Sequence, residues 1–127
     1  ADRRISSGTA PLGDGTGTVT GAPDRGAVVL AEAGTWAPEG ERPLRWRATS
    51  RWHAEGGTLA VVHERQGIPA SAVLDRQADG TWVGRAPHVC DADRYAVALR
   101  VDAEAVTVTW TVEGPAKRYT VTTRYAA

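Results

Sequence analysis

Several residue types are rare or missing in this sequence, and each absence excludes something. The single cysteine, Cys90, cannot form an internal disulfide, which is typical of a protein kept in a reducing cytoplasm. Phenylalanine is absent, so five tryptophans and three tyrosines are the only large aromatic side chains for a core or a pocket. Methionine is absent even from position 1, from which we expect that an N-terminal piece has been removed. No apolar run approaches the length of a membrane span and no secretory signal is visible, so we expect a cytoplasmic protein without a membrane partner.

Charge of either sign is not in excess. The 127 residues carry 15 basic and 15 acidic side chains. A balanced chain lacks the basic surface of a nucleic-acid-binding domain, so we expect no nucleic-acid partner. The length suits one domain, large enough to build a core without disulfides.

Strict alternation of apolar and polar residues is the clearest pattern that is present. Residues 106–113 place valines and Trp110 on every second position, with threonines between them. This period of two predicts a strand, because a helix needs apolar residues spaced by three and four. Residues 118–125 repeat the pattern, and a short turn at residues 114–117 makes the two strands antiparallel neighbours. One face of the second strand carries Tyr119, Val121, Thr123 and Tyr125.

Similar runs recur along the chain at intervals of about ten residues, as in an up-and-down barrel. Asp79-Gly80 is a signal for a two-residue hairpin between two of them. We therefore predict an all-β, single-domain antiparallel β-barrel of about eight strands, with a stacked sandwich as the alternative. We expect residues 15–127 to form the barrel domain and residues 1–14 to be a flexible lead-in or the remnant of a first strand.

The strand predicted at residues 44–53 has two faces of opposite character. Trp46 and Trp52 share one face, and the arginines, Arg47 among them, share the other. Placing the tryptophans inside is simpler, because two bare indoles on the surface are awkward for a monomer. In the other arrangement Arg47 and Glu32, which follows an apolar stretch, form a charged lumen that polarises a carbonyl or a carboxylate. The sequence leaves this choice open.

The densest polar cluster surrounds Cys90. On an extended strand His88 and Cys90 point the same way, roughly 6–7 Å apart, which allows a Cys–His nucleophile pair or two metal ligands. A zinc site needs three or four ligands and no second cysteine exists, so we expect no metal and interpret Cys90 as a small buried filler. Imidazole titrates near neutral pH and Asp93 can orient the ring. We therefore expect His88 to matter more for ligand binding or turnover than His53 or His63.

Three motifs stand in the second half of the chain: His88-x-Cys90-x-x-Asp93-x-Tyr95, Trp110-x-Val112-x-Gly114-Pro115-x-Lys117-x-Tyr119, and Thr123-x-Tyr125. Upstream stand Glu32-x-Gly34 and an Arg/Trp-rich run at residues 45–52. Together they resemble an uncharacterised bacterial family of small lipocalin-like domains, over most of residues 15–125. The resemblance implies a calycin-type antiparallel barrel and supplies no assigned function. Residues 64–70 depart from the family's pattern, which implies a remodelled pocket wall or rim.

A small barrel has room for one small ligand, so the expected partner is a small hydrophobic organic molecule in the lumen. We expect a cofactor-free cyclase or isomerase of bacterial specialised metabolism, which works through positioning and a few polar contacts. The residues expected to shape the pocket are Trp46, Trp82, Trp110, Arg47 and Tyr119. The residues expected to transfer protons or polarise a carbonyl are His88, Glu32, Tyr95 and Asp93.

Two other functions remain open. One is a non-catalytic carrier or sensor of a lipid-like or polyketide-like molecule. The other is a haem-binding barrel with one histidine as axial ligand, although no histidine stands in a recognisable haem motif. A homodimer is a further expectation, because outer-face apolar residues such as Val97 or Leu99 would need cover.

Overall fold

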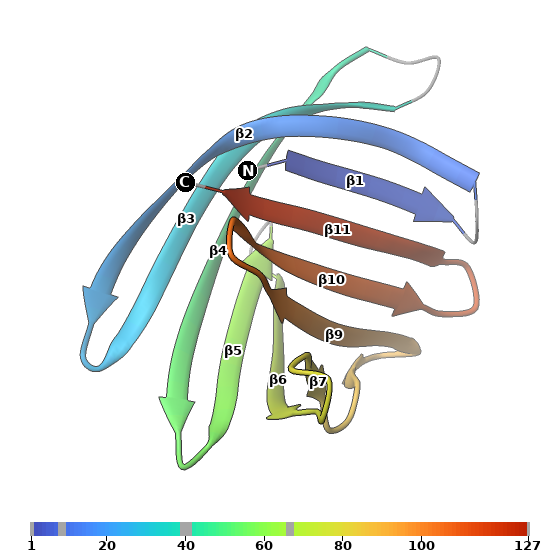
Figure 1. The fold of residues 1–127 in the computed structure, drawn as a ribbon. Coiled ribbons are helices and arrows are strands. Elements are labelled where there is room, and N and C mark those ends of the chain that lie inside the picture. The colour runs from blue at the N-terminus through green and yellow to red at the C-terminus, as the bar shows by residue number, and fades with distance from the viewer. Residues whose placement is uncertain (1, 8–9, 39–41, 66–67, 127) are drawn as a thin grey trace.

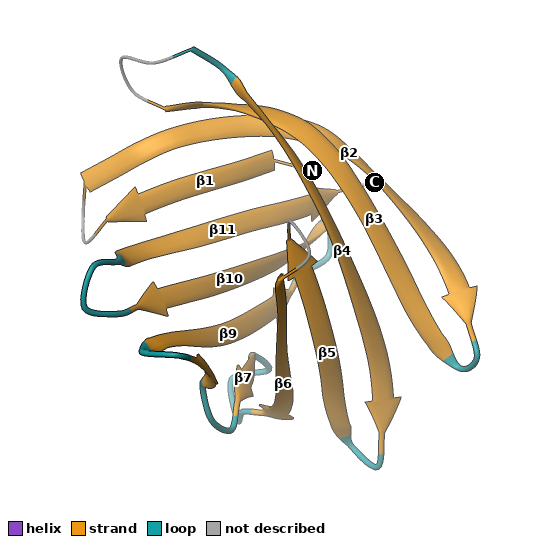
Figure 2. Cartoon of the chain, turned by 180° about the vertical axis from the view of Figure 1, so that it is seen from behind, coloured by secondary structure: helices purple, strands orange, loops and turns teal. Residues whose placement is uncertain are grey.

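The structure, a computed structural model, describes residues 2–7, 10–38, 42–65 and 68–126, and all of its regular elements are strands. They wrap into one antiparallel barrel, over which the long β2 and β3 arch (Figure 1), and no helix appears in the view from behind (Figure 2). The described part of the chain thus contains no helix that is long and apolar enough to cross a membrane. The strands are β1 (Asp2–Ser7), β2 (Ala10–Asp24), β3 (Ala27–Pro38), β4 (Leu44–Glu55), β5 (Thr58–Arg65), β6 (Ile68–Arg76), β7 (Trp82–Gly84), β8 (His88–Cys90), β9 (Asp93–Val101), β10 (Ala105–Glu113) and β11 (Arg118–Ala126).

Neighbouring strands pair antiparallel all the way round, and the ring closes through β11–β1 on one side and β7–β9 on the other. The short strands β7 and β8 share one place in the wall. β7 pairs with β9 at Leu99, whereas β8 pairs with the start of β9 at Tyr95. Eleven strands therefore occupy ten positions. The predicted all-β barrel is confirmed, with slightly more strands than the expected number of about eight.

Residues 2–7 form a wall strand, as in the second of the two alternatives for this segment, and not a flexible lead-in. β1 pairs with β11 from Asp2 to Ser6 and with β2 on its other edge. Figure 1 shows β1 and β11 side by side. The sequence hides this strand because apolar alternation is weak there, whereas pairing on both edges supplies the backbone hydrogen bonds that hold it.

The register sends the aromatic face of β4 inward. Trp46 and Ser50 are buried, whereas Arg45 and Arg47 are exposed on the outer wall. The simpler of the two arrangements considered for this strand is therefore confirmed, and the arginine-lined lumen is wrong. A one-residue change of register would exchange the two faces, and the burial of Trp46 with the partial burial of Trp52 on the same face stabilises the observed register.

Most of the core lies where β5, β6, β9 and β10 face one another. Its buried members include Val61, Ala70, Leu74, Val97, Leu99, Val108 and Trp110. Val97 and Leu99 are 3% and 7% exposed, so the expectation that they lie on the outer face is wrong, and these two residues supply no argument for a dimer. Exposed valines lie elsewhere on the wall, at positions such as Val62, Val73 and Val89.

Alternate glycines let β2 lie very close to β3. A Cβ atom added at Gly15 would lie 2.6 Å from the Thr35 carbonyl oxygen, and one at Gly17 would lie 2.7 Å from Gly34 Cα. Side chains at these positions would overlap the neighbouring backbone, so the glycines permit the close approach of the two strands. The indole of Trp46 also lies against Gly34, where a Cβ atom would overlap its ring.

The turn after β6 is wider than the predicted two-residue hairpin. Residues 77–81 form a loop closed by a hydrogen bond from Gln77 N to Thr81 O, 2.7 Å long. The Asp79 carboxylate accepts hydrogen bonds from Thr81 N and Thr81 Oγ1, which favours this local turn over a tight hairpin. Gly80 has a φ of 87°, a conformation that glycine adopts without strain.

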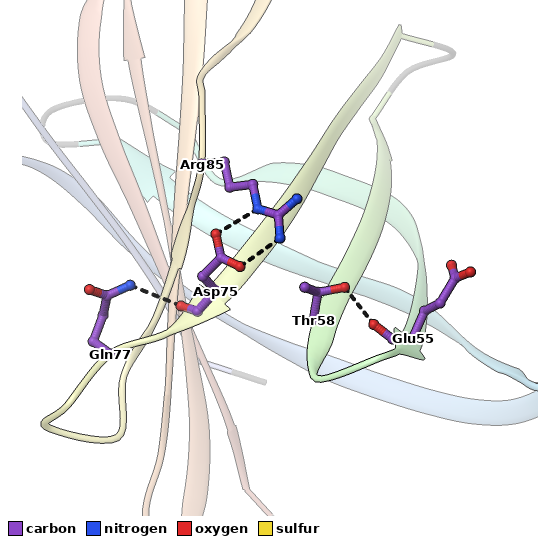
Figure 3. Close-up of polar contacts among 5 residues, drawn as sticks. All are labelled: Glu55, Thr58, Asp75, Gln77 and Arg85. Carbon is purple, nitrogen blue, oxygen red and sulfur yellow. Dashed lines mark hydrogen bonds and ion pairs between the residues drawn. The ribbon is translucent and has the colours of Figure 1, made fainter.

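An ion pair on the outer wall fixes the short strand that follows this turn. Arg85 Nε and Nη2 donate to the two carboxylate oxygens of Asp75 at 2.7 and 2.9 Å (Figure 3). The hydrogen bond from Arg85, reinforced by its charge, lowers the pKa of Asp75. This two-pronged contact, together with the hydrogen bond from Arg85 N to Val73 O, ties the end of β7 to β6.

The glycine contacts predict a difference between two matched substitutions on β2. Gly17→Ala is expected to lower the free energy of unfolding by about 1–3 kcal/mol, because the added Cβ overlaps the Ala33 carbonyl oxygen. Gly21→Ala is the control, because its nearest neighbour is the flexible end of Leu30 at 3.2 Å, and it should change that free energy by less than about 1 kcal/mol. Urea unfolding measures both values. Equal losses would show that close approach to β3 is not what Gly17 provides.

Candidate functional site

A cavity with a volume of about 190 Å³ lies in the lumen of the barrel. Inward-facing side chains of β4, β5, β6, β9, β10 and β11 line it, together with one residue of the β10–β11 turn. All three tyrosines of the chain contribute to this lining. The lining residues are Ser50, Trp52, His63, Ala70, Tyr95, Val108, Trp110, Val112, Lys117, Tyr119, Val121, Thr123 and Tyr125.

Flat ring surfaces dominate one wall of the cavity. Trp110 is buried on β10 between Val97 and Val121 of the adjacent strands, and its ring centroid lies 5.4 Å from that of His63, at an interplanar angle of 36°. The Trp52 indole N–H donates to Ser50 Oγ at 2.9 Å, which fixes its ring orientation. Such a wall favours a ligand with a flat apolar body.

A buried carboxylate lies directly behind the cavity. Glu32 is only 5% exposed, because it occupies an inward position of β3 opposite Ala48. Trp46 Nε1 donates to Glu32 Oε1 at 3.2 Å, and the Tyr125 hydroxyl donates a short hydrogen bond to Glu32 Oε2. A carboxylate in a barrel interior is tolerated when donors of this kind replace water. Since Tyr125 also lines the cavity, its phenol connects Glu32 to the lumen.

The mouth of the cavity carries a second polar pair. Lys117 Nζ lies 3.2 Å from Asp93 Oδ2, and the two side chains are 49% and 23% exposed. The Asp93 carboxylate lies against Gly114, where any side chain would overlap it. The hydrogen bond to Asp93 and the charge of Asp93 raise the pKa of Lys117, so the ammonium stays charged at neutral pH.

His88 does not line this cavity. Its Nδ1 accepts a hydrogen bond from the backbone N–H of Ser71 at 3.3 Å, which bridges β8 to β6 where no backbone pairing joins the two strands. The ring meets Tyr95 edge-on, with centroids 6.2 Å apart, and borders a hollow of the outer wall beside Val73 and Val89. The interrupted strand β7–β8 explains this position, because it leaves β6 with a backbone donor to satisfy. Cys90, close by, is partly exposed rather than a fully buried filler.

The structure thus brings together only some of the residues predicted for the site. Tyr95, Tyr119 and Trp110 line the cavity, Glu32 and Trp46 reach it through Tyr125, and Asp93 holds the cation at its mouth. Three others lie elsewhere. Arg47 is on the outer wall beside Glu64, and Trp82 packs half-buried against the core. His88 lies at the interrupted strand β7–β8, next to β6.

Three of the lining residues that sequence reasoning missed carry ionisable side chains. Tyr125 was detectable, because it shares the inward face of β11 with Tyr119 and Thr123. His63 was detectable in the same way, because it lies two residues after the core residue Val61 on the same face of β5. Lys117 gave no such signal, because it lies in a turn, where alternation carries no information.

The histidines and acids do not converge on a metal. Within the described ranges, no group of three or more His, Cys, Asp or Glu side chains is placed to hold an ion. The three histidines lie apart, with His53 near Gly26 O on the outer wall, His63 in the lumen and His88 between β8 and β6.

The buried carboxylate generates a stability prediction. Tyr125→Phe is expected to lower the free energy of unfolding by about 1–3 kcal/mol. The reason is that buried Glu32 loses a hydrogen-bond donor that water does not replace. Tyr95→Phe, which removes a hydroxyl from the same cavity but none of the donors to Glu32, should cost less. A double-mutant cycle with Glu32→Gln, measured by urea unfolding, isolates the contribution of the pair. A coupling near zero would contradict the assigned contact.

Comparison with known proteins gives a family and no activity. The chain matches no curated protein and no solved structure. A family model does match, over residues 1–127, and its description names no reaction, ligand or partner. By this match the chain belongs to DUF6314, a family of unknown function.

Proposed function

We propose that the protein binds a compact cyclic organic molecule in the barrel lumen and catalyses proton transfer on it, as an isomerase or cyclase. The observation that carries this proposal is the contact between Glu32 and Tyr125. A buried carboxylate is bound by a phenol whose other side faces a ring-lined cavity. This arrangement joins a binding surface to a group that can accept a proton.

The cavity volume supports a compact ligand. An apolar protein cavity of about 150 Å³ is enough for benzene, so about 190 Å³ suits a single substituted ring. A long acyl or polyketide chain, or a tetrapyrrole such as haem, needs far more space. The ligand that we propose is therefore smaller than those of the carrier and haem alternatives.

The chemistry that we propose is a proton relay. The ligand gives a proton from a carbon next to a carbonyl to Tyr125 Oη, while the Tyr125 proton passes to Glu32 Oε2. In a ligand with a C=C bond next to the deprotonated carbon, the resulting dienolate takes the proton back from Tyr125 at the far carbon of that bond while Glu32 returns the Tyr125 proton, so the double bond shifts with no net gain or loss of atoms or electrons. The hydroxyl of Thr123, which lines the same cavity on the same face of β11 as Tyr125, is a donor for the developing oxyanion.

Trp46 supports this relay as a positioning residue. Its indole N–H holds Oε1 of Glu32 at 3.2 Å, which leaves Oε2 for the Tyr125 hydroxyl. The resemblance of the sequence to small bacterial lipocalin-like domains, and the single cysteine, support a bacterial cytoplasmic setting.

Binding is tested with toluene and cyclohexanone as probes, followed by tryptophan fluorescence, because Trp52 and Trp110 line the cavity. We expect Ala70→Leu to weaken the affinity for both probes by at least about ten-fold, since the larger side chain fills a cavity that is already small. The matched control is Ala96→Leu on the exposed face of β9, which should bind like the parent. Equal affinities in the two variants, or a parent that binds neither probe, would refute a lumen site.

Catalysis is tested by proton exchange on bound cyclohexanone in D₂O, followed by NMR. The parent should accelerate exchange of the hydrogens next to the carbonyl, and Glu32→Gln and Tyr125→Phe should lose about a hundred-fold or more of that acceleration while still binding. Tyr95→Phe is the control, because it keeps both members of the relay. Binding without acceleration in the parent would favour the non-catalytic carrier.

A further inference from the structure

Lys117, in the β10–β11 turn, places a positive charge at the lumen cavity. It is the only lysine of the chain, and of the described residues that line the lumen cavity it is the only lysine or arginine. The arginines of β4 show the contrast, because alternation places Arg45 and Arg47 on the outer wall. A lone cation at the mouth of an otherwise ring-lined cavity marks one end of the cavity as suited to a negative charge.

The cation is held in place by its surroundings. The β10–β11 turn is closed by hydrogen bonds from Gly114 N to Lys117 O, 2.8 Å, and from Lys117 N to Gly114 O, 3.3 Å. Asp93 sits in the space that the missing side chain of Gly114 leaves, and binds the ammonium at 3.2 Å. This geometry orients Lys117 at the rim while half of its side chain remains accessible to a ligand.

Asp93 does not use up the binding capacity of the ammonium, which has three donors. Two phenols lie on the same rim. Tyr95 on β9 and Tyr119 on β11 both pair with Val112 of β10, and all three residues line the cavity. An anion at the mouth can therefore accept a hydrogen bond from the ammonium, with the two phenols beside it.

The far end of the site has the opposite preference. Glu32 lies behind Tyr125 at that end, buried and bound by two donors. A carboxylate there disfavours a second negative charge nearby, so the two ends together orient an anionic ligand with its charge towards the mouth.

We propose that the ligand is a compact cyclic carboxylate, whose ring lies against Trp110 and His63 and whose carboxylate meets Lys117 at the mouth. This inference rests on the proposed lumen site and adds the chemical class of its ligand. The raised pKa of Lys117 agrees with an ion-pairing role and argues against an imine with the ligand, for which a neutral amine is needed.

The test compares benzoate, toluene and benzylamine as probes at about 0.15 M salt, where distant charges are screened. In the parent we expect benzoate to bind about ten-fold more tightly than toluene, and benzylamine to bind more weakly than both. Lys117→Met should abolish the preference for benzoate and leave toluene binding unchanged, whereas Lys117→Arg should keep most of the preference. Arg94→Met is the matched control, because it removes one positive charge from the exposed face of β9 close to the same rim.

Each outcome has a distinct meaning. If toluene binds but benzoate binds no better, the carboxylate inference fails and the lumen site stands. If no probe binds, the lumen site itself fails. If Lys117→Met and Arg94→Met weaken benzoate equally, the preference comes from the overall charge and not from Lys117, which also overturns the inference. The melting temperatures of the two lysine variants show whether both remain folded, and Lys117→Arg gives a second measurement if the methionine variant does not.

Discussion

Closure of the sheet is the constraint on which the other features of this protein depend. Once β11 pairs with β1 and β7 pairs with β9, one face of every strand is turned toward a shared interior. Apolar burial and backbone pairing then act together, because a strand that left the ring would expose both its inner face and its hydrogen-bonding edges. The wall is irregular at the interrupted strand β7–β8, where side chains replace part of the backbone pairing. Arg85 binds Asp75 of β6 at the end of β7, and His88 of β8 accepts a hydrogen bond from the N–H of Ser71 on β6.

The interior is small, and its polar groups are unevenly distributed. Rings fill much of the wall around Trp110, while a carboxylate lies behind one end and an ammonium lies at the mouth. Different interactions stabilise the two charged groups. Glu32 is buried and needs the indole of Trp46 and the phenol of Tyr125, whereas Lys117 stays half in water and needs only Asp93 to orient it. Burial makes the first pair important for stability, and accessibility makes the second available to a ligand.

Sequence patterns located the walls better than the site. Alternation on β4 and β11 identified which residues share a face, and the structure turns those faces inward, so that Trp46, Tyr119 and Thr123 all point to the interior. Of the cluster around His88, Tyr95 lines the cavity and Asp93 binds Lys117, whereas His88 itself borders the outer wall, because close spacing along a strand does not show which side of the wall a side chain borders. That cluster lies at an interruption, where His88 completes the pairing of β6. Residues 2–7 were underrated for a related reason, since a strand held on both edges needs little apolar patterning of its own.

The sequence by itself determined the strand class, the alternating faces, the glycines at the β2–β3 contact and the absence of a second cysteine. These are properties of neighbouring residues, which follow from the two-residue period of a strand and from the lack of a side chain on glycine. Only the tertiary structure decided that Glu32 meets Tyr125, 93 positions away, and that Lys117 rather than an arginine stands at the cavity mouth. Such contacts depend on the order and register of ten strand positions round a closed ring, and no local pattern encodes where the ring closes.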